Sequence, residues 1–180
     1  MSDQSLARMF WNRVEKSAGS PAQKFKRQGT WKTLTWREVG DTVRELTAAL
    51  VTLGRRPGDA VGILSTSRAE WVQADFAIFS AGGVTIPIYP TYPPDLIEYI
   101  VNDAGVKTLI VEDPTQLAKV LEVDKSMPGL EHIVIMQGYE GREPSPRTLT
   151  WEGLQRLGRE KAEFLKVELA KRVDGIKRED

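Results

Sequence analysis

The chain has 180 residues, of which 41% are hydrophobic and 28% are charged, and these values are typical of a globular domain built around one core. Its 25 basic and 25 acidic residues cancel, so it lacks the basic surplus that a nucleic-acid-binding protein usually has. It contains no cysteine, which excludes disulfides, cysteine-based metal sites and a cysteine nucleophile.

The beginning of the chain, Met1 to Ser5, has no basic region followed by an apolar run and does not resemble a signal peptide. No apolar stretch approaches the ~20 residues that a membrane-spanning helix needs. We therefore expect a cytoplasmic protein without a transmembrane segment. Peripheral contact with a membrane stays open at this point.

Residues 1–57 are predicted to hold a helix, a short N-terminal hairpin and a second helix. Apolar residues recur at helical spacing over residues 5–14. Two segments rich in β-forming residues then flank a tight turn at Gly29-Thr30, namely residues 23–28 and 31–36. Thr35 and Glu38 form a capping box that opens the second helix, and Gly54 is placed to end it. The aromatic residues of this region are expected in the core: Trp11, Trp31 and Trp36.

Residues 58–138 alternate between short apolar runs and amphipathic segments. The runs predict four buried strands, at residues 60–64, 84–88, 108–111 and 133–136. The segments between them predict crossover helices, so the fold class is α/β with a mostly parallel sheet and helices on both faces. Pro87 cannot donate to a strand ladder, which marks its strand as an edge strand or a bulge. Ser67 and Glu70 form a second capping box in the pattern, and Asp113-Pro114 opens another helix.

Residues 139–180 are predicted to form a polar loop, within Gly138 to Pro146, and a charged helix from Thr150 to about Arg172. The chain then runs through the charged segment Asp174 to Asp180.

No complete catalytic site is visible in the sequence. The single histidine, His132, has no evident partner to orient it and is interpreted as structural. Glu112-Asp113 follows the third strand, where ligands bind in open α/β sheets, but an acidic helix cap explains it better. Ser65-Thr66-Ser67 leads into a helix and could hold an anion, yet it lacks the glycines that let a backbone wrap a phosphate, so capping by Ser67 is preferred.

The exit of the second strand is the most unusual segment. Prolines stiffen it and two tyrosines project from it, in the run Tyr89-Pro90-Thr91-Tyr92-Pro93-Pro94. It lies at the carboxyl end of a parallel strand, the usual ligand-binding edge. A rigid turn with packed aromatic rings and a ligand-lining wall are both open on local grounds.

Several of these segments resemble the conserved motifs of the adenylate-forming superfamily, which includes acyl-CoA synthetases and other AMP-binding enzymes. The run Leu34-Thr35-Trp36-Arg37-Glu38-Val39 resembles the first motif. The run from Phe79 through Gly82-Gly83 to Pro90, with Asp103-Ala104-Gly105, resembles the second. Tyr89 to Tyr92 is most similar to bacterial long-chain fatty acid–CoA ligases. The chain is thus identified as the partial N-terminal subdomain of the adenylate-forming fold, over residues 1–180.

The resemblance implies a parent enzyme that joins a fatty acid to coenzyme A. In this family the carboxylate attacks the α-phosphate of ATP with the help of Mg²⁺, which releases pyrophosphate and gives an acyl-adenylate, and the sulfur of coenzyme A then displaces AMP from the acyl group. The family's phosphate loop, ribose-binding aspartate and catalytic lysine have no counterpart here. We therefore expect a structural fragment with no catalytic residues, no metal site and no cofactor of its own.

One site assignment carries over from the resemblance. In related acetyl-CoA synthetases the matching loop touches coenzyme A, which implies a wall of the coenzyme A cleft at Tyr89, Pro90, Thr91 and Tyr92. Those relatives have glycines where this chain has Pro90 and Thr91. Two other functions stay open: a non-catalytic module that binds an acyl chain or coenzyme A, and an interaction domain that self-associates.

Overall fold

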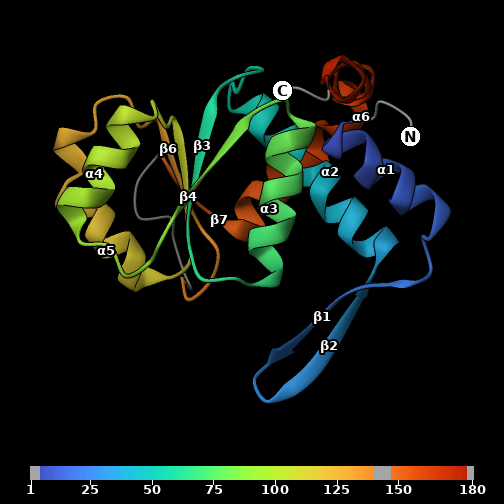
Figure 1. Ribbon diagram of the computed structural model, residues 1–180, viewed down its shortest axis with the longest axis horizontal. Coiled ribbons are helices and arrows are strands. Elements are labelled where there is room, and N and C mark those ends of the chain that lie inside the picture. The colour runs from blue at the N-terminus through green and yellow to red at the C-terminus, as the bar shows by residue number, and fades with distance from the viewer. Residues whose placement is uncertain (1–4, 140–146, 178–180) are drawn as a thin grey trace.

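The computed structural model describes residues 5–139 and 147–177. Its centre is a sheet flanked by helices (Figure 1). The sheet has five strands in the order β4-β3-β5-β6-β7, and every neighbouring pair is parallel. The strands are β3 (Ala60–Leu64), β4 (Val84–Ile88), β5 (Thr108–Val111), β6 (His132–Ile135) and β7 (Thr148–Thr150). The first four were predicted from apolar runs; β7 was missed because it is three residues long and ends on the residue that caps the next helix.

Helices cover both faces of the sheet, as the sequence predicts. One face carries α1 (Leu6–Lys16), α2 (Trp36–Thr52), α3 (Ala69–Ser80) and α6 (Trp151–Gly175). The other face carries α4 (Pro94–Asp103), α5 (Pro114–Glu122) and the 3₁₀ turn η1 (Asp124–Ser126). Each face buries its own apolar cluster, so the strands are apolar on both sides.

The strongest sequence signal for a helix is confirmed. Thr35 and Glu38 form a complete capping box at the start of α2, with the Thr35 amide 2.7 Å from the Glu38 carboxylate. Gly54 follows the helix with φ of 84°, a conformation that favours glycine. Further along the chain α6 crosses α2 closely at Gly158, where an added Cβ would lie 1.7 Å from the carbonyl oxygen of Glu45. Only glycine allows this crossing.

The second predicted capping box is wrong. The N-cap of α3 is Arg68, which makes no side-chain cap hydrogen bond, and Ser67 is exposed. Glu70 turns instead to two arginines, because a buried carboxylate gains more from charged donors than from a single backbone amide. By contrast, the predicted cap at Asp113 is confirmed, since its side chain accepts from the amide of Gln116 at 3.0 Å.

The strand that contains Pro87 lies at the edge of the sheet, as predicted. The hairpin is also confirmed, with β1 (Pro21–Arg27) antiparallel to β2 (Thr30–Thr35). Its turn centres on Gln28-Gly29, one residue earlier than predicted, and both residues have positive φ. Trp31 was expected in the core but is 61% exposed on this hairpin, so that expectation is wrong. Trp11 and Trp36 do pack against the core.

Candidate functional site

The carboxyl ends of the strands form the edge at which a ligand would be expected. The chain leaves β3 toward α3 on one face of the sheet, and it leaves the adjacent β5 toward α5 on the opposite face. Neighbouring strands whose connections diverge in this way leave a crevice between them, and open α/β sheets bind ligands there. The side chains that occupy this crevice therefore determine whether a ligand can bind at this edge of the sheet.

The crevice between β3 and β5 is closed by Glu112, the residue that follows β5. Its carboxylate accepts hydrogen bonds from the Thr66 amide at 2.7 Å, the Thr66 hydroxyl at 2.8 Å and the Ser65 hydroxyl at 3.2 Å. Burial opposes ionisation of Glu112, but these hydrogen bonds and nearby Arg68 outweigh it and hold its pKa below the ordinary value. The hydroxyl-rich loop after β3 does bind an anion, and that anion is the protein's own carboxylate.

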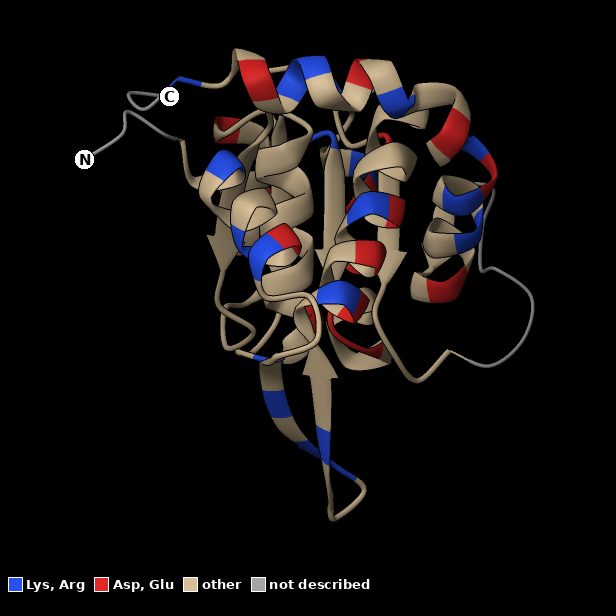
Figure 2. Ribbon diagram, turned by 90° about the vertical axis from the view of Figure 1, so that its right-hand side faces the viewer, with Lys and Arg blue, Asp and Glu red and all other residues tan. Residues whose placement is uncertain are grey.

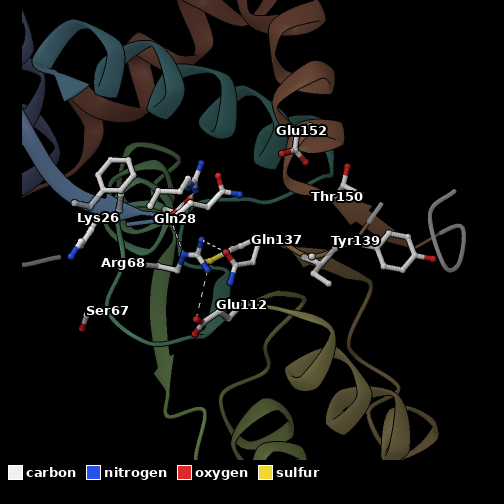
Figure 3. Close-up of a pocket in the computed structure, with 16 residues that line it drawn as sticks. Lys26, Gln28, Ser67, Arg68, Glu112, Gln137, Tyr139, Thr150 and Glu152 are labelled. Carbon is white, nitrogen blue, oxygen red and sulfur yellow. Dashed lines mark hydrogen bonds and ion pairs between the residues drawn. The ribbon is translucent and has the colours of Figure 1, made fainter. Parts of the chain in front are cut away.

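A network centred on Arg68 extends from this clamp. Its Nε donates to Glu70 at 2.9 Å and its Nη2 donates to the side chain of Gln137 at 2.8 Å. Arg27, from the hairpin, pairs with the same Glu70 carboxylate. Burial works against the charge of Glu70, yet the bond from Arg68 and the nearby Arg27 keep its pKa below the ordinary value. The network thus ties the hairpin, α3 and the ends of β5 and β6 together (Figure 3).

A cavity of about 820 Å³ lies beside this network. Its volume is in the range of small-molecule sites, but its walls are mostly polar and its central charges are already paired. Its labelled lining residues in Figure 3 are Lys26, Gln28, Ser67, Arg68, Glu112, Gln137, Tyr139, Thr150 and Glu152. Within residues 5–139 and 147–177 no group of three or more histidine or acidic side chains is arranged to hold a metal ion.

The predicted coenzyme A wall lies at the same edge but outside this cavity. Tyr89, Pro90, Thr91 and Tyr92 follow β4 directly, and none of them lines the 820 Å³ cavity. Tyr89 is 68% exposed and meets Tyr92 edge to face, with ring centroids 5.5 Å apart. The ammonium of Lys119, from α5, donates to the carbonyls of Pro90 at 2.6 Å and Tyr92 at 3.1 Å. A cation on the neighbouring helix therefore holds the loop in shape.

His132 lies far from this chemistry in the fold, at the amino end of β6. Burial, and then the charge of Arg55, lower its pKa, so it is neutral at physiological pH. Among the described residues its Nδ1 has no hydrogen-bond partner. Within the described residues, therefore, no hydrogen bond to Nδ1 orients the ring as a catalytic base.

Sequence reasoning found the segments of the site but missed the network that joins them. Arg27 and Glu70 are 43 residues apart, and Thr66 and Glu112 are 46 apart. No local pattern reports such a pairing. The only available hint was the position of Ser65, Glu112 and Gln137, each at the carboxyl end of a predicted strand.

Comparison with known proteins identifies the family. The AMP-binding enzyme family matches residues 10–169. The chain belongs to this family. It is 29% identical over 154 residues to the long-chain-fatty-acid–CoA ligase ACSBG2 of Rattus norvegicus, a match that covers 86% of this chain and 23% of the relative. It is 33% identical over 110 residues to the long-chain-fatty-acid–CoA ligase FadD15 of Mycobacterium bovis, covering 61% of this chain and 18% of the relative.

Solved structures agree with this family assignment. The anthranilate CoA ligase AuaEII in complex with anthranoyl-AMP superposes with a TM-score of 0.75 at 27% identity, over 87% of this chain and 29% of that protein. The acetoacetyl-CoA synthetase from Streptomyces lividans gives a TM-score of 0.74 at 22% identity, over 83% of this chain and 24% of that protein, and shows the shared fold. The AMP-binding chain therefore has the adenylate-forming fold but spans only about a quarter of these proteins. None of its described helices is long and apolar enough to cross a membrane.

Proposed function

We propose that this AMP-binding chain is the N-terminal segment of an acid–thiol ligase that converts a long-chain fatty acid to its coenzyme A thioester in the cytosol. The observation that carries the proposal is the family match over residues 10–169, together with relatives that are long-chain-fatty-acid–CoA ligases. The parent would use ATP, Mg²⁺ and coenzyme A. Its parts within this chain would be residues 1–57, the βαβ core at 58–138 and the lead-in at 139–180.

The segment itself would act as a framework. Mg²⁺ prefers carboxylate and water oxygens, and a nucleotide needs a cradle of backbone amides. Of the three carboxylates that line the cavity, Glu70 and Glu112 are each engaged by arginine or by hydroxyl and amide donors, and no group of three acidic or histidine side chains among the described residues is arranged to hold a metal ion. The described residues thus do not fit Mg²⁺ or ATP, and the catalytic steps would belong to parts of the parent outside this chain.

One wall of the coenzyme A cleft would come from Tyr89, Pro90, Thr91 and Tyr92. The segment follows the edge strand β4, and Tyr89 presents most of its ring to solvent. Lys119 fixes the carbonyls of Pro90 and Tyr92, so the wall would be formed before the ligand arrives. Preorganisation of this kind lowers the entropic cost of binding.

The framework role is tested by ATP–pyrophosphate exchange. We expect no exchange above background when the 180-residue chain is mixed with ATP, Mg²⁺ and palmitate. A chimera in which this chain replaces the matching segment of a long-chain-fatty-acid–CoA ligase should form palmitoyl-CoA. Robust exchange by the isolated chain would refute the framework role, and an inactive but folded chimera would count against the ligase assignment.

The coenzyme A wall is tested in the same chimera. Tyr89→Ala should raise the KM for coenzyme A while leaving ATP–pyrophosphate exchange unchanged, because exchange precedes the thiol step. Tyr99→Ala is the matched control, since Tyr99 is 63% exposed on α4 and lies outside the loop. An unchanged KM for coenzyme A in Tyr89→Ala would remove these residues from the cleft.

A second candidate function is a binding module without chemistry. The exposed ring of Tyr89 and the preformed loop favour it, because a planar adenine could stack there. Calorimetric titration of the isolated chain with coenzyme A and palmitoyl-CoA tests it. Dissociation constants well below about 1 mM, which is roughly −4 kcal/mol, would support this function.

A third candidate is self-association. The sheet ends in the edge strand β4, where Val84 is 48% exposed, and α6 exposes Phe164 at 87% and Val167 at 68%. Uncovered strand edges and apolar side chains favour association of copies. Light scattering that shows a monomer over a wide concentration range would exclude it.

A further inference from the structure

The hairpin formed by β1 and β2 projects away from the helices and sheet (Figures 1 and 2). It is held to the body near its base, where the Gln23 side chain donates to the carbonyl of Ala69 and accepts from Gln73. Arg27 reaches back to Glu70 from the same ribbon. The strand register puts Lys24, Lys26 and Trp31 on one face, because Lys26 lies opposite Trp31 and Lys24 is two residues away.

This ribbon is the most one-sided charged segment of a chain that is neutral as a whole. Between Glu15 and Glu38 there is no acidic residue and there are six basic ones, namely Lys16, Lys24, Lys26, Arg27, Lys32 and Arg37. Figure 2 shows basic positions along the projecting ribbon and no acidic ones. The hairpin therefore carries a local positive field that the body does not share.

Four of these six residues lie in the hairpin, and three of the four are free to meet a partner. Arg27 is engaged with Glu70. The lysines Lys24, Lys26 and Lys32 are exposed, and none of them has an ion pair within the described part of the chain. In Figure 3, Lys26 points away from the Arg68 network. Thus one basic residue of the hairpin, Arg27, forms an ion pair with the body of the protein, and the other three are exposed to solvent.

An exposed tryptophan shares its face of the hairpin with Lys24 and Lys26, whereas Lys32 lies on the other face, opposite Phe25. Trp31 is 61% exposed, and the ammonium of Lys24 lies 5.2 Å from the centre of its ring. Indole rings favour the interface between water and lipid, where the apolar body and the N–H are both accommodated. Lysines beside such a ring can reach lipid phosphates while their stems lie along the acyl boundary.

We infer that the hairpin docks the protein on an anionic phospholipid bilayer, with Trp31 at the headgroup level, Lys24 and Lys26 beside it against lipid phosphates, and Lys32 adding electrostatic attraction from the other face of the ribbon. Nucleic acid fits the surface less well. Its binding usually needs an extended basic track, whereas here the basic surface is confined to one hairpin of a neutral chain. The ammonium of Lys24 also covers one face of the Trp31 ring, a face that a base would need for stacking.

The inference goes beyond the proposed ligase function and does not depend on it, because adsorption to a bilayer requires no chemistry. Vesicle flotation therefore tests it on the 180-residue chain. We expect binding at low salt to vesicles of equal parts phosphatidylcholine and phosphatidylglycerol, and no binding to phosphatidylcholine alone. The triple variant K24Q/K26Q/K32Q should weaken binding about 100-fold, since each lysine near an anionic surface contributes roughly a fivefold factor.

The matched control is K161Q/K166Q/K171Q, which removes the same charge from exposed positions of α6. It should weaken binding by less than about threefold, because these lysines alternate with acidic residues on their helix. Brominated lipids should quench tryptophan emission of the wild type, and Trp31→Phe should lose that quenching while remaining folded.

The inference is overturned by equal binding to both kinds of vesicle, by no binding to the anionic vesicles, or by an equal loss in the two triple variants. It is also overturned if Trp31→Phe keeps the lipid quenching. Displacement of the wild type from anionic vesicles by a short duplex DNA, with loss of DNA binding in K24Q/K26Q/K32Q, would reassign the hairpin to nucleic acid.

Discussion

Two regions of this molecule carry concentrated charge, and they use it in opposite ways. At the carboxyl edge of the sheet, Arg68, Glu70 and Glu112 are largely buried and each is paired. On the hairpin, Lys24, Lys26 and Lys32 are exposed and have no acidic neighbour in their segment. Charges of the first kind specify the fold, and charges of the second kind are available to a partner.

The contrast also explains why the cavity beside the network is a weak candidate for catalysis. A catalytic acid or base needs a proton or lone pair directed at the substrate. The carboxylates of Glu70 and Glu112 already accept hydrogen bonds from arginine, hydroxyl and amide donors. Variants that remove one partner at the edge should damage stability, whereas variants on the hairpin should leave stability almost unchanged. The following changes test that difference in order of expected size.

Glu70→Ala should have the largest effect. It removes the nearer carboxylate partner of the largely buried Arg68 guanidinium, which then has only Glu112 at 3.6 Å, and it releases Arg27, which anchors the hairpin. Breaking a buried pair from one side costs about 3 kcal/mol of unfolding free energy, measured by urea denaturation. The control is Glu152→Ala, which removes a carboxylate from the same cavity wall and should cost no more than about 0.5 kcal/mol. Equal costs in the two variants would show that the network is not a structural element.

Glu112→Ala should cost less, about 2 kcal/mol, because the groups it orphans are hydroxyls and one amide rather than a charge alone. Glu112→Gln keeps an acceptor oxygen for the Thr66 amide and should lose about half as much. The amide of Thr66 should exchange with deuterium faster in Glu112→Ala than in the wild type. If that amide kept its protection, the clamp between β3 and β5 would be held by other contacts.

The same two carboxylates predict how stability changes in acid. Both have a folded-state pKa below the ordinary value of 4.5, so their stabilisation is fully present above that value and is lost as the pH falls through the lowered folded pKa. The loss should be smaller than in the alanine variants, because a protonated carboxyl still forms some hydrogen bonds. Urea midpoints should fall below about pH 4.5 in the wild type and fall less steeply in Glu70→Gln combined with Glu112→Gln. In K24Q/K26Q/K32Q the urea midpoint should fall with decreasing pH as steeply as in the wild type.

Features that depend on residues close together in the sequence were predicted, and features that depend on residues far apart in the sequence were missed. The capping box of Thr35 and Glu38 is contained within four residues, and the apolar runs that form the sheet are local as well, so both could be read directly. The second box failed at Glu70 because two arginines, one of them 43 residues away, compete for its carboxylate. Trp31 was misplaced for a related reason, since aromatic character alone does not say which face of a hairpin meets the core.

The site shows the same division. The carboxyl edge was predicted from strand order along the chain, which follows from crossover connections. The closing of its crevice by Glu112 could not be predicted, because it depends on β3 and β5 being neighbours while β4 lies outside them. The sheet order is a tertiary property that no single apolar run encodes.

The smallest expected effect lies at the tip of the hairpin. Gln28 has φ of 49° and Gly29 has φ of 79°, the left-handed pair of a two-residue hairpin turn. Asparagine tolerates this conformation better than glutamine, so Gln28→Asn should stabilise the hairpin by about 0.5 kcal/mol. The hairpin can fray without global unfolding, so amide exchange of Trp31 and Lys32 is the sensitive measurement. Gln28→Val should have the opposite sign, because a β-branched residue is strained at positive φ. If Gln28→Asn slowed amide exchange and left vesicle binding unchanged, the lipid-facing charges would act independently of how rigidly the turn holds them.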